Sequence, residues 1–209
     1  MSSNTNAVRT QQGAGARTRN IAFTGMFAAI AAVLMFLEFP LPFAPSFYEL
    51  DFSEVPVLIG TFALGPVSGM VIELIKILVK TVIKGTHTAG VGEIANFVIG
   101  CSLCVPAGLI YKMRKTRKSA VIGMIAGTLT MTVVGCLVNV FVLLPAYAAA
   151  FQMPMDALVA MGTAVNSSVT GLASFALLCV APFNLFKGAV VSVLTLLLYK
   201  RISRLIKGV

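Results

Sequence analysis

Long apolar runs alternate with short polar or charged stretches along most of the chain. A helix needs about 20 predominantly apolar residues to cross the hydrocarbon core of a bilayer, and most of these runs approach that length. The runs that we expect to form helices cover residues 21–37, 55–64, 67–83, 92–111, 120–144 and 172–198. The pattern therefore predicts an all-α membrane protein built as a six-transmembrane-helix bundle.

The polar stretches between these runs set the expected domain organisation. Residues 1–19 are rich in Ser, Asn, Gln, Gly and Arg, which predicts a disordered cytoplasmic tail. Residues 39–54 hold three prolines and residues 145–166 hold two, so we expect both segments to be external loops rather than spans. Residues 20–209 are then expected to form a single six-helix transmembrane domain.

Composition supports the membrane class. Hydrophobic residues make up 58% of the 209 residues and charged residues 11%, with a mean hydropathy of +0.95. A soluble domain carries about 25% charged residues. The net charge of +9 does not indicate nucleic-acid binding, because twelve of the 16 basic residues flank predicted helices. They are Arg9, Arg17, Arg19, Lys112, Arg114, Lys115, Arg117, Lys118, Lys200, Arg201, Arg204 and Lys207.

The two signs of charge lie at opposite ends of the predicted helices. The twelve basic residues can all lie on one side of the membrane if the number of spans is even. Six of the seven acids lie in or beside the other loops, namely Glu38, Glu49, Asp51, Glu54, Glu93 and Asp156. This asymmetry follows the positive-inside rule and predicts that both termini are cytoplasmic.

A stripe of charged residues marks the predicted helix over residues 67–83. Glu73, Lys76, Lys80 and Lys84 are spaced by three, four and four residues, so they share one helix face. Charged side chains are costly in hydrocarbon, and we expect this face to meet the bundle interior, water or another protein. Glu73 and Lys76 are expected to form an internal ion pair, and Lys84 to reach the outer interface.

A second costly placement lies in the last apolar segment, within Pro182-Phe183-Asn184-Leu185-Phe186-Lys187-Gly188. A charged residue at the centre of a membrane helix costs roughly 2.5–3.5 kcal/mol. Asn184 and Lys187 share a helix face, and roughly 16 Å of helix separate Lys187 from the basic end that begins at Lys200. We therefore expect this face to line a ligand cavity. The alternative is a lysine that snorkels to an interface or bonds to a neighbouring helix.

Further polar residues lie at a similar depth in other predicted helices. Glu93 and Asn96 lie near the start of the helix over residues 92–111, and Asn139 lies near the outer end of the helix over residues 120–144. Together with Asn184 and Lys187 they form a set of mostly neutral hydrogen-bonding groups. Such a set suits a neutral, flat ligand with amide-like edges. For Glu93 the alternative is an acid that favours the helix dipole.

The first predicted helix carries small residues at helical spacing. Gly25 and Ala29, and Ala28 and Ala32, are pairs separated by four positions, which allow another helix to approach closely. From the motif alone, docking of a partner membrane subunit and ordinary packing within the bundle remain open.

Catalytic and metal-binding signatures are not found. No paired carboxylates, histidine cluster or activated nucleophile falls in the apolar runs, so an enzyme is not expected. No Walker A sequence occurs. Cys101, Cys104, Cys136 and Cys179 lie in apolar segments and the chain has one histidine, His87, so no metal site is expected.

Four motifs carry a resemblance to a known family. They are Asp51-Phe52-Ser53-Glu54-Val55-Pro56, Phe62-Ala63-Leu64-Gly65-Pro66-Val67-Ser68-Gly69, Gly90-Val91-Gly92-Glu93-Ile94-Ala95-Asn96-Phe97 and the 182–188 stretch above. In this order they resemble the riboflavin-specific substrate-binding (S) component of energy-coupling factor (ECF) transporters. The likeness extends over essentially the whole chain from the first to the last predicted helix.

The resemblance implies a six-helix protein in the plasma membrane of a prokaryote that binds riboflavin near the extracellular face. It implies partners, namely a transmembrane coupling protein and two cytoplasmic ATPases, and no cofactor besides the transported ligand. Riboflavin would be held by Asn184 and Lys187, with Asn139, Asn96 and Glu93. Gly25, Ala28, Ala29 and Ala32 would form the docking surface. The alternatives are an S component for another vitamin or for flavin mononucleotide, and a stand-alone secondary transporter.

Overall fold

The computed structural model describes residues 3–45, 47–86 and 88–207, except for the side chains of residues 3–14, 16 and 200–207. The described chain is helical apart from one two-stranded hairpin and short connections. Its elements are α1 (Ser3–Met35), β1 (Phe39–Pro40), β2 (Glu49–Leu50), α2 (Glu54–Leu64), α3 (Pro66–Lys84), α4 (Val91–Met113), α5 (Arg117–Val138), the π-helix η1 (Asn139–Leu143), α6 (Leu144–Ala150), α7 (Met155–Val165), α8 (Leu172–Phe175), the π-helix η2 (Ala176–Val180) and α9 (Ala181–Lys207).

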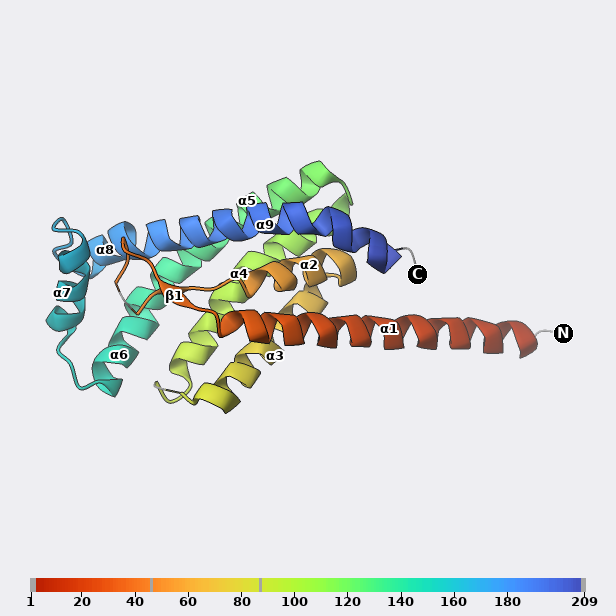
Figure 1. The fold of residues 1–209 in the computed structure, drawn as a ribbon, viewed down its shortest axis with the longest axis horizontal. Helices are drawn as coiled ribbons and strands as arrows, with labels where there is room; N and C mark the ends of the chain where they lie inside the picture. The colour runs from red at the N-terminus through yellow and green to blue at the C-terminus, as the bar shows by residue number, and fades with distance from the viewer. Residues whose placement is uncertain (1–2, 46, 87, 208–209) are drawn as a thin grey trace.

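The helices α1 and α9 run along the long axis of the molecule, and α3, α4 and α5 run obliquely to it (Figure 1). The start of α1, the α4–α5 connection and the end of α9 lie at one end, whereas α6, α7 and α8 lie at the other. The helix α2 is the most enclosed, because every residue from Glu54 to Phe62 is buried. It packs against α1, α3, α4 and α9, and so forms the centre of one of the two apolar core clusters.

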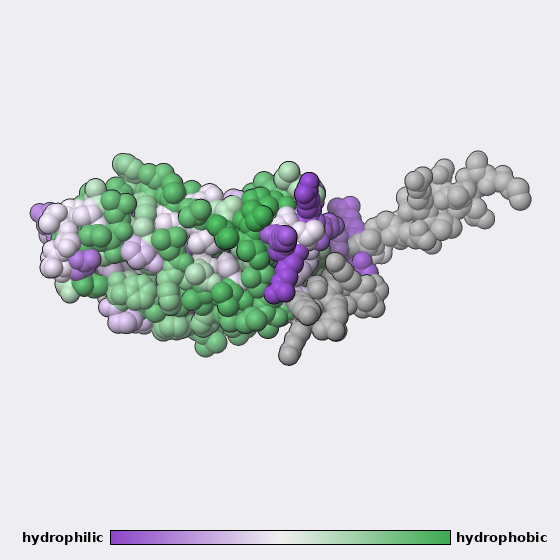
Figure 2. Space-filling view, turned by 90° about the horizontal axis from the view of Figure 1, so that it is seen from above, coloured by the Kyte–Doolittle hydropathy of each residue, from purple (hydrophilic) through white to green (hydrophobic). Residues whose placement is uncertain are grey.

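The apolar character of the chain is visible on its surface. Figure 2 shows hydrophobic residues over most of the visible face, with strongly hydrophilic residues gathered near one end. Among the described residues, four segments are long and apolar enough to cross a membrane: Arg17–Met35, Val91–Met113, Arg117–Ala150 and Leu172–Tyr199. The helix α2 is short and α3 carries the charged stripe, so neither meets this criterion. The predicted all-α membrane class is confirmed, and the count of six spanning helices stays a prediction.

Two segments that we predicted to lack regular structure are helical. Residues 3–19 continue α1 instead of forming a disordered tail. The predicted external loop over residues 145–166 contains most of α6 and all of α7. Its two prolines do not interrupt these helices. Pro154 immediately precedes α7, where its missing N–H has no helical acceptor. Pro145 lies inside the continuous helical segment Arg117–Ala150, just after the π-helical turn η1.

The chain reverses between α2 and α3 at Gly65, so α2 does not continue as a longer span. Gly65 has a φ of 110°, a conformation that glycine adopts without the steric cost a side chain would bring. The two helices then pack closely, because a Cβ atom added at Gly69 would lie 2.0 Å from the Thr61 hydroxyl oxygen. This reversal places the charged stripe of α3 beside the acidic start of α2.

The most extensive helix contact joins α4 and α5. A Cβ atom added at Gly127 would lie 2.3 Å from the Leu103 carbonyl oxygen, and one added at Gly123 would lie 2.7 Å from the Ala107 carbonyl oxygen. These neighbours are backbone atoms, which cannot rotate away as a side chain can. Gly123 and Gly127 thus form a small-residue pair that lets two spanning helices touch along their backbones.

We therefore expect Gly127→Ala to destabilise the bundle by about 1–3 kcal/mol, because overpacking forces the two helices apart. The matched control is Gly25→Ala, since a Cβ atom at Gly25 meets no atom within 4 Å. Thermal unfolding of both variants in detergent checks the expectation. Equal unfolding temperatures for the two alanine variants would contradict it.

Candidate ligand-binding site

A cavity of about 780 Å³ lies between α3, α4, η1, α9 and the segment that joins α1 to α2. All five residues that we proposed for ligand binding line it, namely Glu93, Asn96, Asn139, Asn184 and Lys187. They come from three separate segments of the chain, so the tertiary structure brings them together around one space. This volume lies within the range of pockets that bind small molecules and cofactors.

Lys187 lines this cavity and also has a protein partner. Its ammonium nitrogen lies 2.9 Å from Oδ2 of Asp51, and the two side chains are 12% and 8% exposed. Burial alone would raise the pKa of Asp51, but the Lys187 and Lys76 ammonium groups hold it well below its usual range. Asp51 is therefore ionised at neutral pH. Lys187 thus lines the cavity as expected, and its protein partner lies in the segment before α2 and not on a neighbouring helix.

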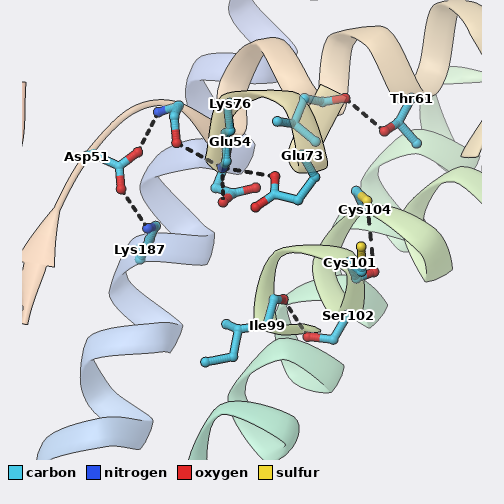
Figure 3. Close-up of polar contacts among 12 residues, drawn as sticks. Asp51, Glu54, Thr61, Glu73, Lys76, Ile99, Cys101, Ser102, Cys104 and Lys187 are labelled. Atoms are coloured by element: carbon cyan, nitrogen blue, oxygen red, sulfur yellow. Dashed lines mark hydrogen bonds and ion pairs between the residues drawn. The ribbon is translucent and has the colours of Figure 1, made fainter. Parts of the chain in front are cut away.

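A second buried lysine extends the same network (Figure 3). Oδ1 of Asp51 accepts a hydrogen bond of 2.7 Å from the Ser53 backbone N–H, and the Ser53 hydroxyl accepts one of 2.9 Å from Lys76. The Lys76 nitrogen also lies 2.6 Å from Glu54 and 2.9 Å from Glu73. The predicted pair of Glu73 and Lys76 is confirmed. The short segment before and at the start of α2 thus contacts both buried lysines.

The lysines at the end of α3 share a different carboxylate. Lys80 and Lys84 both form ion pairs with Glu38, which follows α1. Partial burial alone would raise the pKa of Glu38, but hydrogen bonds and charges from the two lysines lower it. Lys84 is partly exposed as expected, and its ammonium group forms an ion pair with Glu38. Glu38, Lys80 and Lys84 all line the cavity.

Two of the three cavity asparagines, Asn139 and Asn184, are held by hydrogen bonds to their own helices. Nδ2 of Asn139 donates to the Gly135 carbonyl oxygen over 2.7 Å, and Nδ2 of Asn184 donates to the Val180 carbonyl oxygen over 3.0 Å. Asn139 is the first residue of η1, and Val180 is the last residue of η2. Single π-helical turns are frequent at functional sites. Here they occur in both of the helices that carry Asn139 and Asn184.

Tyr48 closes over Asn139 from the segment between the two strands. Its hydroxyl donates to Oδ1 of Asn139. Burial raises the pKa of the Tyr48 phenol well above its usual value, so the group remains a neutral donor. Asn184, by contrast, has no hydrogen-bond partner for its Oδ1 among the described residues. That oxygen is an acceptor available at the cavity.

Aromatic and apolar side chains form the remaining wall. The ring of Tyr48 packs against Phe183 with a centroid distance of 5.3 Å, and Phe47 packs against Tyr147 at 5.7 Å. These residues and Phe151 line the cavity. Glu93 accepts a hydrogen bond of 3.0 Å from Thr86, while Asn96 lies one helical turn deeper. The cavity can therefore cover a flat ring and offer amide, carboxylate and ammonium groups to its edges.

Sequence reasoning missed Asp51, Glu38 and Tyr48 as site residues. All three lie in or beside the proline-containing segment that we expected to be a loop, where periodicity gives no direction for a side chain. The available signal was charge balance, because a buried lysine in an apolar bundle requires a carboxylate partner. Acids outside the predicted spans were the candidates for that partner.

The predicted docking residues of α1 do not share one environment. Ala28 and Ala32 are 1% and 4% exposed and pack inside the bundle, whereas Gly25 and Ala29 are exposed. Ala28 and Ala32 thus support the alternative of internal packing and offer no surface in this conformation. A docking role remains a prediction for Gly25 and Ala29 only.

The described residues contain no group of three or more side chains that could hold a metal ion. His87 lies outside the described residues. All four cysteines are free thiols.

Comparison with known proteins agrees with this geometry. The family model of the ECF transporter substrate-specific component matches residues 19–199. The "Riboflavin transporter RibU" of Staphylococcus aureus (strain TCH60) is 37% identical, over 88% of this chain and 90% of that protein. The "Riboflavin transporter FmnP" of Bacillus subtilis (strain 168) is 32% identical, over 90% and 93% of the two chains.

A solved structure, described as "Structure and mechanism of the S component of a bacterial ECF transporter", is 36% identical to this chain. It matches with a TM-score of 0.71 and covers 91% of this chain and 99% of that one. Fold and cavity define a small helical membrane protein with a polar-lined cavity. The chain belongs to the family of ECF transporter substrate-specific components, as the resemblance of its motifs predicted.

The buried network around Lys76 yields a stability prediction. Lys76→Met leaves Glu54 and Glu73 buried without their cation, so we expect a loss of about 3–5 kcal/mol of stability. The control is Lys112→Met, which changes an exposed lysine in the last turn of α4. Thermal unfolding in detergent measures both. A Lys76→Met protein that unfolds at the temperature of the control would show that the pairs carry no such stability.

Proposed function

We propose that this chain is the riboflavin-binding subunit of an ECF transporter, an ATP-driven vitamin importer. The observation that carries the proposal is the cavity in which Asn139, Asn184 and Lys187 meet an aromatic wall. The names of its relatives point to the same vitamin. An isoalloxazine ring has an apolar dimethylbenzene end and a pyrimidine end rich in donors and acceptors. The apolar wall suits the first and the amides suit the second.

Selectivity follows from the polar groups. Asn184 is 5% exposed, and its Oδ1 is available to accept a hydrogen bond from a donor group of the ligand. A ligand that lacks this donor leaves the amide buried and unpaired, which costs about 1–3 kcal/mol. The packed rings of Phe183 and Tyr48 form the neighbouring wall of the cavity and exclude water from it. The site therefore discriminates by hydrogen-bond pattern as well as by shape.

The membrane arrangement and the partners belong to the same proposal. Both termini lie on the cytoplasmic side of a prokaryotic plasma membrane, because the basic α4–α5 connection lies at the same end of the bundle as the start of α1 and the end of α9 (Figure 1). In that orientation α2 and α3 complete six passes, and the chain works with a transmembrane coupling protein and two ATPases. Gly25 and Ala29, exposed on α1, contribute to the docking surface.

A binding titration tests the ligand. We expect the purified protein to quench flavin fluorescence when riboflavin is added. Asn184→Ala should weaken binding by about 5- to 150-fold, because the ligand loses its hydrogen bond to the Asn184 amide. The matched control is Asn166→Ala, an asparagine that follows α7 and does not line the cavity. Wild-type protein that binds no flavin, or Lys187→Ala protein that binds as tightly as wild type, would contradict the proposal.

A transport assay tests the dependence on partners. In vesicles that contain this chain alone, we expect no riboflavin accumulation. Addition of a coupling protein, two ATPases and ATP should start accumulation, because the energy source lies in the partners. Uptake by the isolated chain would contradict the proposed role and favour a stand-alone transporter.

A further inference from the structure

The charged groups around the cavity are out of balance. Five acidic side chains and three lysines line it, which leaves a formal excess of two negative charges. The acids are Glu38, Glu49, Asp51, Glu54 and Glu93, and the lysines are Lys80, Lys84 and Lys187. In a partly enclosed space between apolar helices, these charges are less screened than at an open surface.

None of the three cavity lysines is available to an anion without losing a protein partner. Lys187 lies 2.9 Å from Asp51. Lys80 and Lys84 both pair with Glu38, so one carboxylate occupies two ammonium groups. An anionic ligand that recruited Lys187 would leave Asp51, whose side chain is only 8% exposed, without its cation. One that recruited Lys80 or Lys84 would compete with Glu38, whose side chain is 12% exposed.

We propose that Glu38 and Asp51 are specificity-determining residues, which make the cavity select an uncharged flavin over its phosphate ester. Each acts by holding cavity lysines that would otherwise attract a phosphate group. The ammonium groups of Lys80 and Lys84 would attract a phosphate if unpaired, but Glu38 together with Glu49, which also lines the cavity, balances their charge. The inference rests on the proposed function, because it concerns which flavin the same site accepts.

The test compares dissociation constants of riboflavin and flavin mononucleotide for purified protein in detergent at low ionic strength. The variants are Glu38→Gln and Asp51→Asn, which remove one negative charge at nearly constant shape. The matched control is Asp156→Asn, in α7, whose side chain is exposed and does not line the cavity. Thermal unfolding of each variant shows that it is folded.

Wild type should bind riboflavin more tightly than flavin mononucleotide. The ratio of the two dissociation constants should fall about tenfold or more in at least one cavity variant and stay constant in Asp156→Asn. If Asp51→Asn does not fold, Glu38→Gln decides, because Glu38 lies outside the buried Lys76 network. Equal affinities in wild type, or an unchanged ratio in the folded cavity variants, would overturn the inference alone. Wild-type protein that binds neither flavin would overturn the proposed function as well.

Discussion

The structure depends on the neutralisation of two buried lysines inside an apolar bundle. Lys187 and Lys76 lie in helices surrounded by hydrocarbon-like side chains, where an unpaired ammonium group is costly. Both are met by one short segment, in which Asp51 contacts Lys187 and Glu54 contacts Lys76. This segment therefore links α9 to α3 and fixes where α2 begins. The cavity lies directly beside that link, so its polar lining depends on the same contacts.

The cavity combines a rigid polar framework with an aromatic wall. The amides of Asn139 and Asn184 are each oriented by a carbonyl group of their own helix, at the points where π-helical turns interrupt regular α-helix. Tyr48 further fixes Asn139 from the opposite side. Preorganised groups lose little freedom when a ligand binds, which favours affinity. The arrangement is consistent with a subunit that captures its ligand and leaves energy conversion to other proteins.

The class of protein and much of the site could be predicted from residues alone. Apolar runs located the long helices, and the cost of Lys187 in such a run indicated a cavity. All five predicted ligand residues line one space, because polar groups in a membrane bundle turn away from lipid. The prediction was weakest where proline was taken as a sign of a loop. Pro154 instead lies at the start of α7, and Pro145 lies within a continuous helical segment just after the π-helical turn η1.

The sequence by itself determined that the chain is an apolar helical bundle with costly polar groups at a common depth, since the energy of burial depends on residue type and spacing. It also carried the motifs of the family. Only the tertiary structure decided which carboxylate meets which lysine, because Asp51 and Lys187 are separated by 136 positions. It likewise decided that Ala28 and Ala32 face inward while Gly25 and Ala29 remain exposed. Small residues permit close approach on any side of a helix, and the neighbours that use it come from the fold.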